Sequence, residues 1–204
     1  AGGQLNMRLA FLLYKYFPYG GLQRDFLRFV EESQKLGHHC RIYYYSWQGE
    51  QPVEADLRKV PVSALTNPRR NTLFTDWVLA DLAADPVDGV IGFNKMPGLD
   101  VYYAADSGYM EKAIQERGWL YRRGSRYRHF AAYESAVFGA ESDTEILLIS
   151  DTERIKFERH YQTDPARMHM LPPGISRDRC APEDAAKRRK AIREKLGLEA
   201  GEHI

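Results

Sequence analysis

The chain has 204 residues, of which 44% are hydrophobic and 28% are charged. A chain of this length and composition can bury one sizeable core, which excludes a fibrous or a disordered protein. The formal net charge of +1 hides an uneven distribution, because arginine and lysine concentrate in residues 112–129 and 187–195, so the overall charge says little about partners.

Cysteine content and apolar runs narrow the expected compartment. Cys40 and Cys180 make no disulfide framework in a chain this long and match no zinc site, so we expect a reducing environment. No apolar run approaches the roughly eighteen residues that cross a bilayer, and no signal peptide precedes Met7. We interpret residues 1–6 as an expression remnant and Met7 as the native start.

The first expected element is a buried strand over residues 9–14. This apolar run ends where Pro18 and the adjacent Gly20 and Gly21 interrupt it. A helix should follow, because apolar residues recur at spacings of three and four over residues 22–30. The segment therefore predicts a strand, a glycine turn and a helix.

Two adjacent glycines before a helix suit an anion. Main-chain N–H groups can approach a ligand closely there, at the positive end of the helix dipole. Gly20 and Gly21 are therefore candidates for binding a phosphate, although they could also do no more than turn the chain. The dinucleotide fingerprint G-x-G-x-x-G and the P-loop GxxxxGK[ST] are both absent.

Strands and helices alternate along the rest of the sequence. Such alternation implies right-handed crossovers and a parallel sheet with helices on both faces, so the expected fold class is α/β and Rossmann-like. The remaining elements expected are strands over residues 40–45, 89–93, 101–105, 145–150 and 167–171, a possible short strand over 60–64, a turn over 67–70, a helix over 73–82, a helix over 151–161 with Ile155 and Phe157 facing inward, and a charged helix over 183–196.

Polar residues follow two of these strands, at the edge where parallel sheets bind ligands. Asp106 follows the strand expected over 101–105, so its carboxylate could grip or deprotonate a sugar opposite the glycine turn. A helix cap or a solvated acid is the alternative. Lys95 follows the strand expected over 89–93 and either holds an anion or is simply solvated.

Arginines and aromatic residues interleave over residues 109–138. Arginines can hold anionic headgroups while aromatic rings lie at the interface, which indicates a membrane-surface segment. The same mixture could bind single-stranded nucleic acid, or form a helical hairpin with an aromatic core and a solvated arginine face. The candidate membrane-contacting residues are Lys112, Arg117, Trp119, Tyr121, Arg122, Arg123, Arg126, Tyr127, Arg128 and Phe130.

Four motifs together resemble a known family. They are YKYFPYGGLQRDF, GFNKMPGLDVYYAAD, SRYRHFAAYE and LPPGI. They resemble the N-terminal half of the lipopolysaccharide-core glucosyltransferases, which are heptose-directed members of the retaining, two-domain (GT-B) glycosyltransferases. The resemblance implies an N-terminal Rossmann-like acceptor domain over residues 7–176, and over 177–204 a linker helix and the start of a missing C-terminal donor-binding domain.

The same resemblance implies an activity and its partners. We expect transfer of a hexose, glucose in particular, from a UDP-sugar to an inner-core heptose of lipopolysaccharide, at the cytoplasmic face of the inner membrane. No metal, no other cofactor and no nucleic acid are expected. Without the donor domain, the chain alone should fold but not transfer sugar at a useful rate, and an inert module of the same fold is the rival reading. The implied roles are donor diphosphate binding for Gly20 and Gly21, catalysis for Asp25 and Asp106, acceptor binding for Lys95 and Asp100, and membrane contact for residues 109–138.

Overall fold

The computed structural model describes residues 6–106, 108–110, 113, 119–171 and 181–197. By its internal contacts the chain divides into two compact units, Ala1–Pro172 and Pro173–Ile204. The second unit contains the helix α7 (Ala185–Lys195), which lies within the charged helix expected over 183–196.

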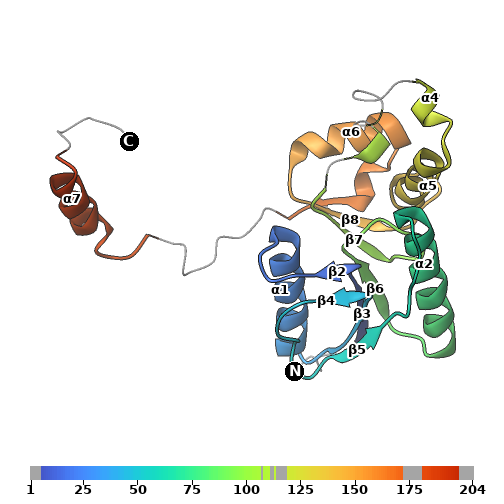
Figure 1. The fold of residues 1–204 in the computed structure, drawn as a ribbon, viewed down its shortest axis with the longest axis horizontal. Coiled ribbons are helices and arrows are strands. Elements are labelled where there is room, and N and C mark those ends of the chain that lie inside the picture. The colour runs from blue at the N-terminus through green and yellow to red at the C-terminus, as the bar shows by residue number, and fades with distance from the viewer. Residues whose placement is uncertain (1–5, 107, 111–112, 114–118, 172–180, 198–204) are drawn as a thin grey trace. The chain divides into compact units, whose positions relative to one another are not determined.

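The first unit is built on a sheet of seven strands in the order β5-β3-β1-β6-β7-β8-β9 (Figure 1). All neighbouring strands are parallel. The α/β class expected from the sequence is therefore confirmed. The strands are β1 (Arg8–Leu12), β3 (His39–Tyr44), β5 (Asp56–Lys59), β6 (Gly89–Gly92), β7 (Val101–Ala104), β8 (Glu145–Leu148) and β9 (Met168–Met170), and a separate pair is formed by β2 (Lys15–Tyr16) and β4 (Ser46–Trp47).

Helices cover both faces of this sheet (Figure 1). Alternate residues of β1, and Leu13 directly after it, point to opposite faces of the sheet. Phe11 and Leu13 join the core beneath α1. Ala10 and Leu12 join the core beneath α2, α5 and α6. A central strand that is buried on both faces needs an apolar residue at every position, which is why the sequence predicted this strand. The helices are α1 (Gly21–Lys35), α2 (Asn67–Ala84), α4 (Trp119–Arg122), α5 (Ser125–Phe138), α6 (Asp151–Tyr161) and a 3-10 turn, η1 (Pro165–Arg167).

The order of the strands reverses at β1. The chain steps from β1 to β3 and β5 on one side and then returns to β6 on the other side of β1. The connections that leave the carboxyl ends of β1 and β6 therefore diverge, and they leave a crevice between them. This switch point is where the fold favours a ligand.

Three local expectations are wrong. The strand expected over 60–64 lies earlier, as β5 (Asp56–Lys59) at the edge of the sheet. Its Asp56 forms an ion pair with the neighbouring strand, at 2.9 Å between Arg41 Nε and Asp56 Oδ2. The turn expected over 67–70 is the first turn of α2, which has Pro68 at its start, a position that proline favours. Ile155 is 68% exposed, because α6 packs through the stripe that contains Phe157.

Candidate functional site

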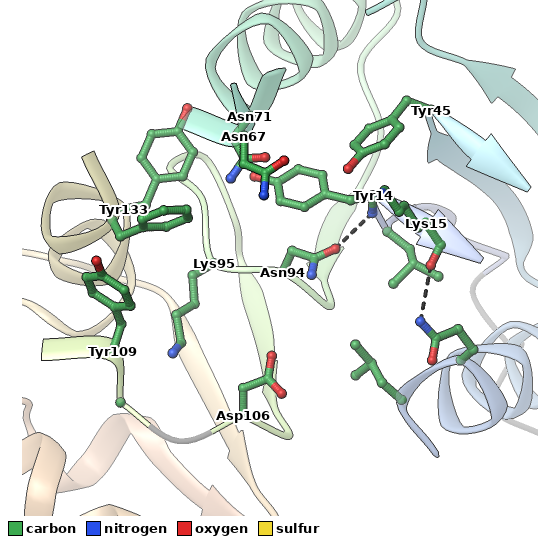
Figure 2. Close-up of a pocket in the computed structure, with 15 residues that line it drawn as sticks. Tyr14, Lys15, Tyr45, Asn67, Asn71, Asn94, Lys95, Asp106, Tyr109 and Tyr133 are labelled. Atoms are coloured by element: carbon green, nitrogen blue, oxygen red, sulfur yellow. Dashed lines mark hydrogen bonds between the residues drawn. The ribbon is translucent and has the colours of Figure 1, made fainter. Parts of the chain in front are cut away.

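A cavity of about 570 Å³ opens at the switch point, beyond the carboxyl ends of β1 and β6 (Figure 2). Its volume lies within the range of small-molecule sites. Its lining combines tyrosines, side-chain amides and three charged side chains. The described lining residues are Leu13, Tyr14, Lys15, Leu22, Gln23, Tyr45, Asn67, Asn71, Asn94, Lys95, Asp106, Gly108, Tyr109, Phe130 and Tyr133.

The floor of the cavity is fixed by an amide that spans the switch point. The Tyr14 N–H donates to Asn94 Oδ1 at 2.8 Å, which joins the segment after β1 to the segment after β6 (Figure 2). The Phe93 N–H donates to the Leu12 carbonyl at 2.9 Å beside it. Because these two bonds join the segment after β1 to the segment after β6, the side chains of the two segments are held in fixed relative positions.

A buried carboxylate holds the wall formed by β7 and α5. Glu134 is 0% exposed. Its carboxylate accepts hydrogen bonds from Lys95 Nζ at 2.8 Å, from the Tyr109 N–H at 2.7 Å and from the Met110 N–H at 2.7 Å. The Tyr161 hydroxyl also donates to it. Burial, and then the nearby Glu134 carboxylate, raise the pKa of Tyr161, so this phenol keeps its proton and remains a donor. A buried charge needs such a set of partners, and this one positions Lys95 and Tyr109.

The aromatic residues of the basic segment pack on one another. Tyr109 lies 5.0 Å from Phe130 between ring centroids, and its hydroxyl lies 2.7 Å from the Tyr121 hydroxyl. Tyr127 contacts both tyrosines, and the Arg126 guanidinium lies 5.5 Å from the centre of the Phe130 ring. Tyr109 and Phe130 line the cavity, Tyr121 and Tyr127 pack against Tyr109, and all four rings are half-buried.

The predicted membrane-contacting residues fall into three groups. Tyr121, Tyr127 and Phe130 belong to the half-buried ring cluster. The arginines that the structure describes are exposed, namely Arg122, Arg123, Arg126 and Arg128. Lys112, Arg117 and the side chain of Trp119 lie outside the described residues. The exposed arginines with packed aromatics match the helical-hairpin reading and leave membrane contact as a prediction.

Gly20 and Gly21 stand at the start of α1. Gly20 is the N-cap residue, and the helix receives no side-chain cap among the described residues. A Cβ on Gly20 would lie 1.8 Å from Gln23 Oε1, whereas one on Gly21 would meet nothing within 4 Å. Gln23 Nε2 donates to the Lys15 carbonyl at 3.2 Å, so Gly20 makes room for a cavity-lining side chain. Neither glycine lines the cavity itself, and their contact with a diphosphate stays a prediction.

The cavity brings together two of the four predicted polar site residues, Lys95 and Asp106. Asp25 lies elsewhere, where its Oδ2 accepts the Tyr103 hydroxyl at 2.9 Å. Asp100 directly precedes β7, and its Oδ2 accepts a hydrogen bond from the Val90 N–H at 2.7 Å. Both carboxylates thus have structural partners, and the geometry favours Asp106 over Asp25 for contact with a ligand.

Several residues of the cavity and its wall were not singled out from the sequence as site residues. Asn94 lies two residues after β6, so its place at the ligand edge could have identified it, as it did Lys95. Glu134 gave a weaker signal, a lone acid on the side of α5 that also carries the buried Val137 and Phe138. Asn71 and Tyr133 gave none, because only the packing of α2 near α5 turns them toward the cavity.

The described residues contain neither a metal-binding cluster nor a membrane-spanning helix. They contain no group of three or more His, Cys, Asp or Glu side chains that could hold a metal ion. No helix within the described part of the chain has both the length and the apolar content needed to cross a membrane.

Comparison with known proteins identifies the relationship. The chain is 48% identical over 198 residues to the lipopolysaccharide glucosyltransferase WaaG of Escherichia coli (strain K12). The chain resembles half of a glycosyltransferase. The match covers 97% of this chain and 53% of the relative, so the chain spans about half the length of this curated relative. No protein-family model matches the chain.

Solved glycosyltransferase structures agree with this relationship. The crystal structure of WaaG, described as a glycosyltransferase involved in lipopolysaccharide biosynthesis, superposes with a TM-score of 0.85 over 96% of this chain and 53% of that chain, at 48% identity. A glycosyltransferase from Rickettsia africae ESF-5 gives a TM-score of 0.52 at 12% identity, over 97% of this chain and 51% of that one, and shows the fold alone. The resemblance drawn from the four sequence motifs is confirmed.

Proposed function

We propose that this chain is the acceptor-binding half of a retaining glycosyltransferase that transfers a hexose, glucose in our expectation, from a UDP-sugar to an inner-core heptose of lipopolysaccharide. The observation that carries the proposal is the cavity at the switch point, in a chain 48% identical to a lipopolysaccharide glucosyltransferase. Aromatic rings offer flat apolar faces to the C–H groups of a sugar, and side-chain amides both donate to and accept from its hydroxyls. Such a lining suits a polyhydroxylated ligand.

The charges suggest how this half contributes to transfer. As the bond between sugar and phosphate breaks, positive charge develops on the sugar and negative charge on the diphosphate. The uncapped first turn of α1 offers main-chain donors that favour the anion, and this arrangement needs no metal. Asp106 orients the acceptor hydroxyl, whose oxygen bonds to the anomeric carbon on the face from which the diphosphate leaves. The bond from that carbon to the phosphate oxygen breaks, and the leaving phosphate takes the proton of the hydroxyl, so the sugar is transferred with retention.

A transfer assay with a radiolabelled UDP-hexose tests the proposal. The two-domain protein should label a heptose-terminated core acceptor, and a chelator should not reduce the rate. The 204-residue chain alone should transfer at a rate close to the background, because the donor site lies mostly in the other domain. Failure of the two-domain protein to label any heptose acceptor would refute the activity, and full activity from this chain alone would refute the division of labour.

We also propose that residues 109–138 contact anionic lipid at the cytoplasmic face of the inner membrane. The support is the exposure of Arg122, Arg123 and Arg128 beside a ring cluster that braces the segment. Each cation near an anionic surface contributes about 1 kcal/mol, or roughly fivefold in partitioning. Single Arg→Gln variants should therefore lower co-sedimentation with anionic vesicles by roughly fivefold each.

Two comparisons decide between lipid and nucleic acid. The variant Arg69→Gln, in the first turn of α2, removes an exposed arginine outside the segment and should leave vesicle binding unchanged. A single-stranded oligonucleotide should not compete with the vesicles. Equal binding to neutral and anionic vesicles, or displacement by the oligonucleotide at low salt, would contradict the lipid proposal and favour nucleic-acid binding.

A further inference from the structure

The charges that line the cavity are unevenly compensated. Lys95 lies 2.8 Å from Glu134, and the side chains of the two residues are 15% and 0% exposed, so the ammonium is paired inside the wall. Asp106 is exposed at the end of β7 and is the one carboxylate among the described lining residues. Figure 2 shows Lys95 and Tyr109 on one side of the cavity and Lys15 and Tyr45 on the other.

Two cations near the Tyr45 ring, Lys15 in the cavity lining and Arg70 behind Asn67, have no carboxylate partner among the described residues. Lys15 Nζ lies 5.8 Å from the centre of the Tyr45 ring, and the Arg70 guanidinium carbon lies 5.8 Å from the same centre. Arg70 donates to neutral acceptors, among them Asn67 Oδ1 at 3.1 Å and the Ala64 carbonyl at 2.9 Å. Within the part of the chain that the structure describes, no carboxylate therefore neutralises either positive charge.

The phenol of Tyr45, near both cations, stays neutral. Burial raises the pKa of Tyr45, although the nearby Arg70 lowers it in part, so the phenol keeps its proton and can donate to a ligand. Asn67, which also lines the cavity, is held by Arg70 next to this ring. A lysine and an arginine near one ring, together with the phenol hydroxyl of that ring, are donors suited to a phosphate or a carboxylate.

We propose that Lys15, Tyr45 and Arg70 form a subsite for an anionic substituent, a phosphate or a carboxylate, on the acceptor sugar. The subsite deepens the proposed function and rests on it. The anion is attracted to this side and repelled by Asp106 at the other, so the sugar enters in one orientation, with its neutral hydroxyls toward Asp106. Specificity then comes from repulsion as well as attraction.

The first experiment uses inorganic phosphate alone and does not depend on which sugar binds. Phosphate is titrated into the isotope-labelled 204-residue chain, and amide and tyrosine signals are followed by NMR. The signals of Lys15 and Tyr45 should shift with phosphate in the wild type and should no longer do so in Lys15→Gln. Lys15→Arg, which keeps the charge, should restore the shifts, and the exposed neighbour Arg69→Gln serves as the matched control and should bind like wild type.

The second experiment compares heptose, heptose phosphate and UDP by titration calorimetry. Heptose phosphate should bind at least about tenfold more tightly than heptose, as expected for two charge-assisted contacts. This preference should disappear in Lys15→Gln and persist in Arg69→Gln. Lys15 makes no side-chain hydrogen bond among the described residues, so its replacement leaves the fold intact, which unchanged amide signals elsewhere confirm.

Each outcome decides the proposal. Absence of phosphate-induced shifts at Lys15 and Tyr45, or equal affinities for heptose and its phosphate, overturns the subsite while the proposed function stands. Weaker binding of UDP but not of heptose phosphate in Lys15→Gln assigns the cations to the donor and overturns the acceptor assignment. Phosphate binding that depends on Lys15, without binding of either sugar, supports the anion subsite and refutes the proposed function.

Discussion

Replacing Glu134 by leucine should lower the free energy of unfolding by about 3–5 kcal/mol, the cost of breaking a buried ion pair from one side. The change removes the carboxylate that pairs with the Lys95 ammonium, which is also the acceptor of two main-chain N–H groups and the Tyr161 hydroxyl. Urea unfolding of the variant and the wild type measures the difference. The isosteric variant Glu134→Gln should lose less, because its amide oxygen can still accept.

Two further variants make this prediction specific. Glu141→Leu removes an exposed acid a few residues along the chain and should change the stability by no more than about 0.5 kcal/mol. Adding Lys95→Met to Glu134→Leu removes the half-buried ammonium together with its carboxylate and should recover part of the loss. Equal effects of Glu134→Leu and Glu141→Leu would show that Glu134 is not the buried hub of this wall.

Replacing Asp106 by asparagine should lower the turnover of the two-domain glycosyltransferase by about two orders of magnitude, the scale of a misplaced reacting group. The amide keeps the shape of the side chain. Its oxygen accepts a weaker hydrogen bond from the hydroxyl of the sugar acceptor than a carboxylate does, so kcat should fall. The affinity for the UDP-sugar should change little, because in the proposed mechanism Asp106 orients the acceptor and not the donor. Steady-state kinetics with a labelled donor, together with direct donor binding, measures both quantities.

Asp25→Asn is the matched control for this experiment. Asp25 lies outside the cavity lining, and asparagine retains the oxygen that accepts the Tyr103 hydroxyl. Its turnover should stay within about threefold of wild type, since the side chain lies outside the cavity lining and keeps its bond to Tyr103, so the change alters stability by roughly 0.5 kcal/mol or less. Unchanged turnover in Asp106→Asn would refute the role of Asp106, and a large loss in Asp25→Asn would restore Asp25 as a catalytic candidate.

Local sequence patterns predicted the elements that have a clear apolar pattern and misplaced those that have none. The strand β1 is apolar on both faces, so its run of residues was unambiguous, and α1 followed from regular apolar spacing after Gly20 and Gly21. The strand β5 lies at an edge and three of its four residues are charged, among them Asp56, which pairs with Arg41, so hydrophobicity placed the strand several residues too late. Ile155 was misplaced because a short helix can turn either of two apolar stripes inward.

The sequence by itself determined the α/β class, the glycine turn before α1 and the positions of Lys95 and Asp106 just after strands, because strand ends follow from local periodicity. Only the tertiary structure decided what surrounds them. Lys95 meets Glu134 across 39 residues of chain, and Tyr14 meets Asn94 across 80. Such pairings depend on strand order and helix packing, which bring distant side chains together without leaving a periodic signal in either segment.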